Sequence, residues 1–380
     1  MENLTDFYLE YNHAHCLHDV TVYSVWQPDV DCHPALKSQT NHYVFIKKDG
    51  WRAKLKKHLR RLMHGEGYYH YSIEYYLDEA LKDIRRKHFD VIVVENRPGY
   101  ALRLKGITQA RLVYHLHNEK LNRQVPRFQE IYDAADRILT VSDYIRRNVM
   151  TINPHDRKTH TLHNGIDLAA FCRKGDASRK GDASRKDIGL GDEDFVVVFS
   201  GRVNPDKGIA QLVEAFALLD AYPHIQLMVV GSSFFGNANT DDPFITALKQ
   251  KAAPLEERIL FTGFIPYARM PAYLQMADVA CIPSVWDDPF PTTVLEAQAM
   301  GLPIIATRRG GIPEEVGEAN AILLEADGQL AARLAAAITD LYEHPEKRKK
   351  MSEASLSRSR AFGKDAYARN FFAMLPTAIT

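Results

Sequence analysis

The segment FVVVFSGRVNPDKG at 195–208 combines glycines and cations in a way that suits a phosphorylated ligand. Gly201 and Gly208 let the backbone turn and approach a ligand closely, because glycine has no Cβ. Arg202 and Lys207 can neutralise a diphosphate, Arg through its forked donors and Lys as a point charge. The alternative is that both cations are simply solvated. Neither GxxxxGKS nor GxxxxGKT occurs in the chain, so this segment is not a Walker phosphate loop.

A second segment, PSVWDDPFPTTVLEAQAMGLPIIAT at 283–307, predicts a helix that begins near Thr292. The first backbone N–H groups of a helix have no partner within that helix, so those of Thr292, Thr293 and Val294 are expected to be unpaired. A helix N-terminus of this kind attracts phosphate. We expect it to face the cations of the first segment across a bound diphosphate.

Two carboxylates accompany this helix. Asp288 precedes it, and Glu296 lies one turn inside it, where it can accept hydrogen bonds from sugar hydroxyls. The alternative for Glu296 is an exposed position on an amphipathic helix. Its neighbours are almost wholly apolar, and a carboxylate in such surroundings needs partners, which favours the binding role.

The elements that must position these residues are short apolar strands separated by helical patterns. Such strands are typical of parallel sheets covered by helices on both faces. We therefore predict an α/β protein with two doubly wound domains and ligands at the carboxyl ends of the strands. The strands are predicted at 19–25, 42–46, 90–94, 111–115, 137–141 and 158–162 in the first half, and at 195–199, 226–230, 259–262, 278–282, 303–306 and 321–324 in the second.

The boundary between the domains is expected at a duplicated hexapeptide, KGDASR, at 174–179 and 180–185. The repeat has no apolar residue larger than Ala, so it cannot anchor itself in a core, and an exposed connection is the simplest interpretation. The predicted organisation has an N-terminal domain, a linker, a C-terminal domain and a final helix that could pack back on the N-terminal domain. Their bounds are 1–170, 171–190, 191–360 and 361–380.

Composition narrows the class of protein. The 380 residues hold 48 basic and 48 acidic side chains and are 46% hydrophobic, which excludes a disordered chain. The sequence shows neither a membrane-spanning apolar run nor the pattern of a signal peptide. The cysteines at 16, 32, 172 and 281 have neither disulfide-framework nor metal-ligand spacing, which favours a reducing cytoplasm.

The stretch KKDGWRAKLKKHLRR at 47–61 holds eight Lys or Arg and one Asp. One interpretation is a solvated helix face or loop. The other is a basic amphipathic surface that meets anionic lipid or an anionic acceptor, which would make the protein peripheral to the inner face of the cell membrane. Nucleic-acid binding is not expected, because the domain as a whole is not strongly basic.

The series GRVNPDKG, ADVACIPS, DPFPTTVLEAQAMGLPIIAT and GGIPE resembles the retaining glycosyltransferases of family 4. The resemblance implies two Rossmann-like domains in the GT-B arrangement, and a nucleotide-sugar donor held mainly by the C-terminal domain. It assigns the donor diphosphate to Arg202 and Lys207, with Gly201, Thr293 and Val294 around it. The family's paired acids in the E-x7-E pattern would be Asp288, touching the donor sugar, and Glu296, touching the ribose. Asp288 is one methylene shorter than the usual Glu.

VYHLHNE at 113–119 resembles the family's histidine segment, with His117 as the closest match and His115 as the alternative. The resemblance makes His117 and Asp288 the catalytic candidates, with His117 orienting the donor. LHNGID at 162–167 resembles the end of the family's N-terminal domain. Family members place a strand and a Gly-rich loop ahead of a helix like the one predicted at Glu2–Tyr11, and this sequence lacks them at that place. We expect either a misassigned or truncated start, or a natural remnant.

The implied reaction moves a sugar, most commonly from a UDP-sugar, to a hydroxyl of a glycan or lipid-linked acceptor in surface polysaccharide or lipopolysaccharide biosynthesis. No cofactor or metal is expected, because Arg, Lys and a helix N-terminus stabilise the leaving diphosphate. Asp29-Val30-Asp31 fits a DxD pattern only formally. The alternatives are a homologue that binds donor without transferring it, and a nucleotide-sugar epimerase or phosphorylase on the same architecture.

Overall fold

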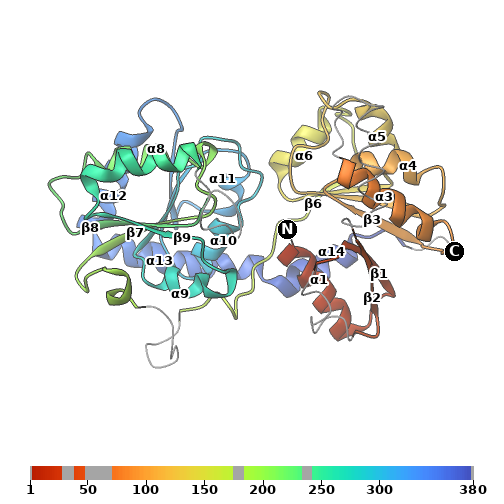
Figure 1. Cartoon of the computed structure of the whole chain (residues 1–380), viewed down its shortest axis with the longest axis horizontal. Helices are drawn as coiled ribbons and strands as arrows, with labels where there is room; N and C mark the ends of the chain where they lie inside the picture. The colour runs from red at the N-terminus through yellow and green to blue at the C-terminus, as the bar shows by residue number, and fades with distance from the viewer. Residues whose placement is uncertain (1, 28–37, 48–70, 174–183, 233–241, 378–380) are drawn as a thin grey trace. The chain divides into compact units, whose positions relative to one another are not determined.

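A computed structural model describes residues 2–27, 38–47, 71–173, 184–232 and 242–377. The chain divides into two compact units. Unit 1 consists of Met1–Val141, Arg146–Leu162 and Tyr367–Thr380, and unit 2 of Ser142–Ile145 and His163–Ala366. Each unit contains parallel strands alternating with helices, as the sequence predicts (Figure 1).

Unit 2 is built on a six-stranded parallel sheet with the strand order β12-β11-β10-β7-β8-β9. Most positions in these strands are buried, because helices cover both faces of the sheet (Figure 1). The strands are β7 (Phe195–Ser200), β8 (Ile225–Val230), β9 (Ile259–Gly263), β10 (Val279–Ile282), β11 (Ile304–Thr307) and β12 (Ala321–Leu324).

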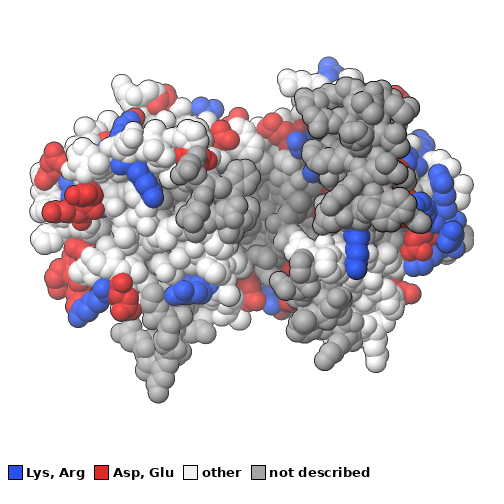
Figure 2. Space-filling model, viewed as in Figure 1, with Lys and Arg blue, Asp and Glu red and all other residues white. Residues whose placement is uncertain are grey.

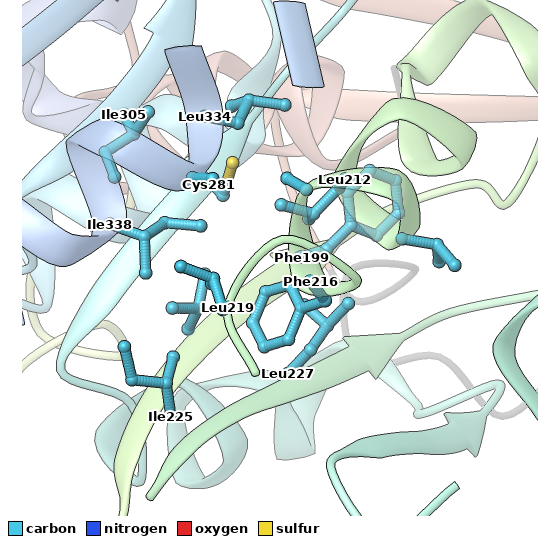
Figure 3. Packing of buried hydrophobic residues seen from close by; sticks show 14 of the residues in the cluster. Phe199, Leu212, Phe216, Leu219, Ile225, Leu227, Cys281, Ile305, Leu334 and Ile338 are labelled. Carbon is cyan, nitrogen blue, oxygen red and sulfur yellow. The ribbon is translucent and has the colours of Figure 1, made fainter. Parts of the chain in front are cut away.

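The helices of unit 2 pack in two layers. Helices α7, α8 and α12 share one core with the sheet, in which Phe199, Phe216, Leu227 and Ile338 meet (Figure 3). Full burial of each such side chain contributes about 1.5–3 kcal/mol. The α-helices are α7 (Ile209–Phe216), α8 (Pro243–Ala252), α9 (Met270–Gln275), α10 (Thr292–Ala299), α11 (Ile312–Glu315), α12 (Leu330–Glu343) and α13 (Pro345–Ser359), and short 3₁₀ turns lie at Lys186–Ile188, Pro205–Lys207, Ala253–Leu255, Tyr267–Arg269 and Arg360–Phe362.

Unit 1 contains two separate parallel sheets among its described strands. Strands β1 (Val20–Val25) and β2 (Asn41–Ile46) pair only with each other, and the larger sheet has the order β3-β4-β5-β6. Its strands are β3 (Val91–Glu95), β4 (Arg111–Leu116), β5 (Arg137–Thr140) and β6 (Thr159–Thr161). The α-helices are α1 (Glu2–His15), α3 (Tyr71–Ile84), α4 (Ala101–Leu104), α5 (Phe128–Ala134), α6 (Asp143–Met150) and α14 (Lys364–Ala373), with a 3₁₀ turn at Pro98–Tyr100. The first three residues of α6 and of α14 are assigned to unit 2.

One apolar cluster connects the pieces of unit 1. Phe7 and Tyr8 of α1 and Phe371 of α14 are buried together with Val113 and Leu139 of the larger sheet. Side chains of β1 and β3 pack against the same cluster, so the first and last helices cover strands of both sheets. The rings of Tyr8 and Phe371 stack with their centroids 4.0 Å apart.

The long segment of unit 2 begins at His163, a few residues before the linker predicted at 171–190. The reason is that the segment after Leu162 is bound to unit 2. The side-chain amide of Asn164 donates to the carbonyl oxygen of Phe290 at 3.1 Å, and Arg173 Nε donates to the carbonyl oxygen of Met300 at 2.8 Å.

The end of the duplicated hexapeptide is also anchored, although its composition predicted an exposed connection. Arg185 donates to Asp278 Oδ2 at 2.8 Å and to the carbonyl oxygens of Met276 and Asp194, both at 2.9 Å. The prediction considered apolar anchors only, and here a guanidinium supplies the attachment. The rest of the repeat, at 174–183, lies outside the described residues.

Lys, Arg, Asp and Glu side chains are interspersed over the described part of the face seen in Figure 2. The basic stretch 47–61 falls outside the described residues apart from Lys47. Among the residues that the structure describes, no helix is both long enough and apolar enough to cross a membrane.

Candidate functional site

The strand order of unit 2 creates a switch point between β7 and β10. From β7 the chain continues to β8 on one side, whereas β10 lies on the other side and leads on to β11. In open α/β sheets, ligands bind beyond the carboxyl ends of the strands at such a point. The two segments singled out in the sequence follow these two strand ends, because β7 ends at Ser200 and β10 at Ile282.

The two segments are bound to each other. The carbonyl oxygen of Asp206 accepts hydrogen bonds from the backbone N–H groups of Val285 at 2.9 Å and Trp286 at 3.2 Å. Gly208 lies so close to the other segment that a Cβ on it would meet the carbonyl oxygen of Pro283 at 1.8 Å. The loops after β7 and β10 therefore form one surface.

Lys207 and Asp288 form an ion pair between the two segments, Nζ to Oδ2. The Asp288 side chain is 7% exposed and that of Lys207 20% exposed, so the pair is largely shielded from water. Arg202, by contrast, is exposed and makes no ion pair among the described residues. The two predicted diphosphate cations thus differ, since Arg202 is available to an anion and Lys207 already balances a carboxylate.

Helix α10 begins beside this pair. A Cβ on Gly201 would lie 3.7 Å from Thr293 Cγ2, so the loop after β7 faces the start of the helix. Among the described residues, the N–H groups of Thr292 and Thr293 have no hydrogen-bond acceptor. The prediction for Val294 is wrong, because its N–H donates to the carbonyl oxygen of Pro291 at 3.0 Å. The tight turn at Pro291 uses this donor, and two amides remain for an anion.

Glu296 is buried within α10, with only 4% of the residue exposed. Burial raises the pKa of its carboxyl to about 7, although a hydrogen bond with Thr292 one turn earlier opposes the shift. A carboxyl that ionises near neutral pH and has one local partner can accept hydrogen bonds from hydroxyl groups of a ligand. This burial disfavours the exposed alternative considered from the sequence.

The glycine pair of GGIPE holds the backbone of the acidic loop. The N–H of Gly311 donates to the carbonyl oxygen of Asp288 at 2.7 Å. Gly310 has a φ of +55°, and a Cβ on it would lie 2.1 Å from the same oxygen. Only glycine fits there, so this turn fixes the position from which Asp288 reaches Lys207.

Glu315, at the end of α11, is a site residue that the sequence did not reveal. Its side chain is fully buried, and neither carboxyl oxygen has a hydrogen-bond partner among the described residues. Burial, followed by the charge of Asp288, holds its pKa well above the usual range. The only sign of it in the sequence is its position directly after GGIPE.

His117 belongs to unit 1 and takes part in a separate cluster at the end of β4. Its Nε2 and the Nδ1 of His115 each lie 3.1 Å from Glu95 Oε2. Burial, and next the neighbouring His115, lower the pKa of His117 to about 4, so its imidazole is neutral at pH 7. The other predicted residues, Gly201, Arg202, Lys207, Asp288, Thr293, Val294 and Glu296, all lie in unit 2.

Solved structures share this architecture. HepE of Anabaena, in a crystal structure with UDP-glucose, superposes with a TM-score of 0.73 at 18% identity, covering 97% of this chain and 96% of that chain. Sucrose-phosphate synthase of Thermosynechococcus elongatus gives 0.75 at 20% identity, covering 98% and 92%. These likenesses define the fold as that of the GT-B glycosyltransferases.

Family models cover both units. Residues 181–358 match the family described as Glycosyl transferases group 1, and residues 16–170 match Glycosyltransferase Family 4. Each half of the chain is thus similar to one kind of glycosyltransferase domain.

Two of three curated relatives are named as glycosyltransferases, and the other as a spore coat protein. YtcC of Bacillus subtilis is 32% identical over 267 residues, covering 68% of this chain and 65% of that protein. Spore coat protein SA of the same species is 28% identical over 324 residues, covering 83% and 85%. D-inositol 3-phosphate glycosyltransferase of Corynebacterium glutamicum is 31% identical over 257 residues, covering 66% and 59%. The chain thus spans less than two thirds of the first and third relatives.

Proposed function

We propose that this chain is a retaining glycosyltransferase that takes its sugar from a UDP-sugar. The observation that carries the proposal is the surface at the switch point of unit 2, where Lys207, Asp288 and the start of α10 meet. It combines cations and amide donors for a diphosphate with carboxylates for hydroxyl groups. HepE, which shares the fold, was crystallised with UDP-glucose, and this supports uridine as the base.

In the proposed complex, Arg202 and the N–H groups of Thr292 and Thr293 bind the diphosphate, because no other partner in the described structure occupies them. Lys207 shares its charge between the diphosphate and Asp288, which contacts the donor sugar. Glu296 accepts hydrogen bonds from the ribose.

Charge develops on the leaving diphosphate as the bond to the sugar breaks. The preorganised cations and amides stabilise it, and the acceptor attacks from the same face while its hydroxyl proton passes to the leaving phosphate. Retention follows because the new bond forms on the face that the leaving group occupied. His117 orients the donor and takes no part in covalent chemistry.

The test is a thermal-shift panel of UDP-, GDP- and ADP-sugars on the wild type and on Lys207→Ala. Stabilisation by UDP-sugars alone, lost in the variant, supports the proposed donor. Stabilisation by another nucleotide class would overturn the choice of base, and no stabilisation by any of them would overturn the donor site. Anomeric analysis of a transfer product by NMR then decides between retention and inversion.

For the acceptor we propose a hydroxyl of a glycan or glycolipid of surface polysaccharide or lipopolysaccharide, reached at the membrane face through the basic stretch 47–61. The excess of cations in that stretch supports the proposal. Co-sedimentation with anionic liposomes should therefore weaken when residues 54, 56, 57, 60 and 61, all Lys or Arg, become Ala. Unchanged co-sedimentation would exclude this surface.

A homologue that binds the donor without transferring it is the second candidate. It is favoured by the separation of β1–β2 from the larger sheet among the described strands, since acceptor binding would use unit 1. Thermal stabilisation of the protein by the donor, with neither sugar transfer nor donor hydrolysis, would identify such a homologue.

A further inference from the structure

Three ligand-type side chains converge in unit 1, and the strand register explains why. Glu95 ends β3 and is paired in parallel register with His115 on β4. Side chains two residues apart in an extended chain lie on the same face, which places His117 beside His115. The carboxylate and both imidazoles therefore project from one sheet edge to the same side.

The donor atoms are close enough to share an ion. Glu95 Oε2 lies 3.1 Å from His115 Nδ1 and 3.1 Å from His117 Nε2, and all three donors lie within 4.8 Å of one another. Zinc bonds of about 2.0–2.1 Å in tetrahedral geometry separate neighbouring ligand atoms by about 3.3 Å. The carboxylate is thus already at the ligand spacing from both rings.

Contacts outside the cluster hold two of the ligands. The hydroxyl of Tyr8 donates to Glu95 Oε1 at 2.9 Å, and Asn96 Oδ1 accepts from the backbone N–H of His117 at 3.2 Å. The side chain of His115 is fully buried, whereas His117 is 11% and Glu95 25% exposed. Solvent can therefore reach the side of the cluster formed by Glu95 and His117.

We propose that Glu95, His115 and His117 form a binding site for a divalent cation of the zinc class in unit 1. Two imidazoles and one carboxylate suit zinc or cobalt better than magnesium or calcium, which prefer oxygen ligands. Three protein ligands leave a fourth position for water. On binding, each ring carries its proton on its other nitrogen, so the cation replaces two N–H···O hydrogen bonds to Glu95.

The affinity is expected to be moderate. His115 Nε2 is buried without a hydrogen-bond partner among the described residues, so the ring lacks the outer acceptor that metal-bound histidines usually have. The absence of such a partner typically weakens binding about 10- to 100-fold.

Occupancy would also regulate transfer, a consequence that rests on the proposed function. His117 is the residue proposed to orient the donor. A cation bound to its Nε2 would keep the ring within the cluster, so that this nitrogen could not contact the donor. We therefore expect zinc to inhibit sugar transfer and a chelator to restore it.

The test uses untagged, chelator-treated protein of full length, with Co²⁺ as the probe. We expect one equivalent of cobalt to give the visible ligand-field bands of a four-coordinate site, without the sulfur charge-transfer band that cysteine ligands produce. Zinc should abolish these bands by displacement.

Glu95→Gln and His117→Ala should each weaken cobalt binding about tenfold or more, because loss of an outer partner already costs that much and a direct ligand contributes more. His160→Ala, on β6 of the same unit, is the matched control and should bind as the wild type does. Circular dichroism checks that each variant is folded. Equal binding by the wild type and both ligand variants, or no four-coordinate bands, would overturn the site and leave a hydrogen-bonded cluster only.

This readout does not depend on transfer, so an inactive enzyme that still shows the bands would refute the proposed function and leave the metal site standing. If UDP-sugar stabilises the protein and sugar transfer is observed, but cobalt gives no four-coordinate bands, the metal site is refuted and the proposed function stands. Bands together with zinc-insensitive transfer would overturn the regulatory consequence alone.

Discussion

At the scale of single residues, the switch-point surface is defined by one shielded ion pair and a buried carboxyl beside it. Lys207 faces Asp288 directly, and the buried carboxyl of Glu315 lies close enough to both to interact electrostatically with them. Because burial raises the pKa of Glu315, its carboxyl stays protonated, and Lys207 balances the single charge of Asp288. A bound anion needs a further positive charge, and Arg202, which is exposed in the loop after β7, can supply it.

Lys207→Met should therefore lower stability, because it leaves Asp288 shielded and unpaired. We expect a loss of about 2 kcal/mol in the free energy of unfolding. The double variant Lys207→Met with Asp288→Asn should recover most of it, since neither charge remains. Urea unfolding followed by circular dichroism measures both. A single variant as stable as the wild type would show that the pair contributes nothing.

Because the pKa of Glu296 is raised in the folded chain, we predict that stability depends on pH. Its pKa is about 7 in the folded chain and near 4.5 when unfolded, so the folded state retains the proton between these values. The stabilising contribution is complete below about pH 4.5 and is lost as the pH rises through about 7, a change on the order of 3 kcal/mol.

Glu296→Gln stays neutral at every pH and is the matched comparison. The difference in unfolding free energy between wild type and variant should fall between about pH 4.5 and 7 and then level off. Urea unfolding across this range measures it. A difference that does not change with pH would mean that Glu296 ionises normally in the folded chain.

At the scale of elements, much of the architecture was readable from the sequence. The strands predicted at 195–199, 226–230 and 278–282 correspond to β7, β8 and β10 within a residue or two, because short apolar runs rich in β-branched residues favour buried strands over helices. The two charged segments were expected at the carboxyl ends of strands, and they follow β7 and β10.

The sequence could not predict contacts that depend on strand register or on the geometry of tight turns. Nothing near Glu95 in the sequence points to His115 or His117, because pairing of β3 with β4 joins residues about twenty positions apart. The occupied N–H of Val294 depends on the turn at Pro291. Arg185 was judged by the composition of its repeat, whereas its attachment is a set of hydrogen bonds.

The glycine turn before α11 gives a prediction at this scale. In Gly310→Ala the new methyl would meet the carbonyl oxygen of Asp288 at 2.1 Å, at a φ of +55° that alanine disfavours. We expect a loss of about 2 kcal/mol or more in stability, together with weaker donor binding as the acidic loop shifts.

Gly328→Ala is the control, because a Cβ there has no heavy atom within 4 Å and the backbone is not left-handed. It should unfold like the wild type. Thermal denaturation with and without UDP-sugar compares the two variants. Equal melting temperatures would show that the turn can relax without disturbing Asp288.

At the scale of the whole molecule, the two units have separate cores, one around the six-stranded sheet and one under α1 and α14. Donor contacts are proposed mainly for unit 2. A ligand that binds one folded unit stabilises that unit by mass action. Differential scanning calorimetry should therefore show UDP-sugar raising the transition of unit 2 and leaving that of unit 1 in place.

Phe371→Ala makes the complementary test, because it destabilises unit 1 rather than stabilising unit 2. Phe371 is 2% exposed and belongs to the core of unit 1, so its truncation should cost about 3–5 kcal/mol there. The unit 2 transition and its shift with UDP-sugar should persist. Loss of donor stabilisation in this variant would show that the two units do not unfold independently.

The position of α14 also bears on how the protein is made. A ribosome releases the chain from its N-terminus, and domains generally fold in that order. Here the last helix supplies Tyr367, Ala368 and Phe371 to the core of the unit that contains the first helix. Every residue of unit 2 has been synthesised by Ala366, before those of unit 1 are complete. During synthesis, α1 can therefore pack on Val113 and Leu139 early, whereas the part of its face that α14 covers stays open until Phe371 has been made.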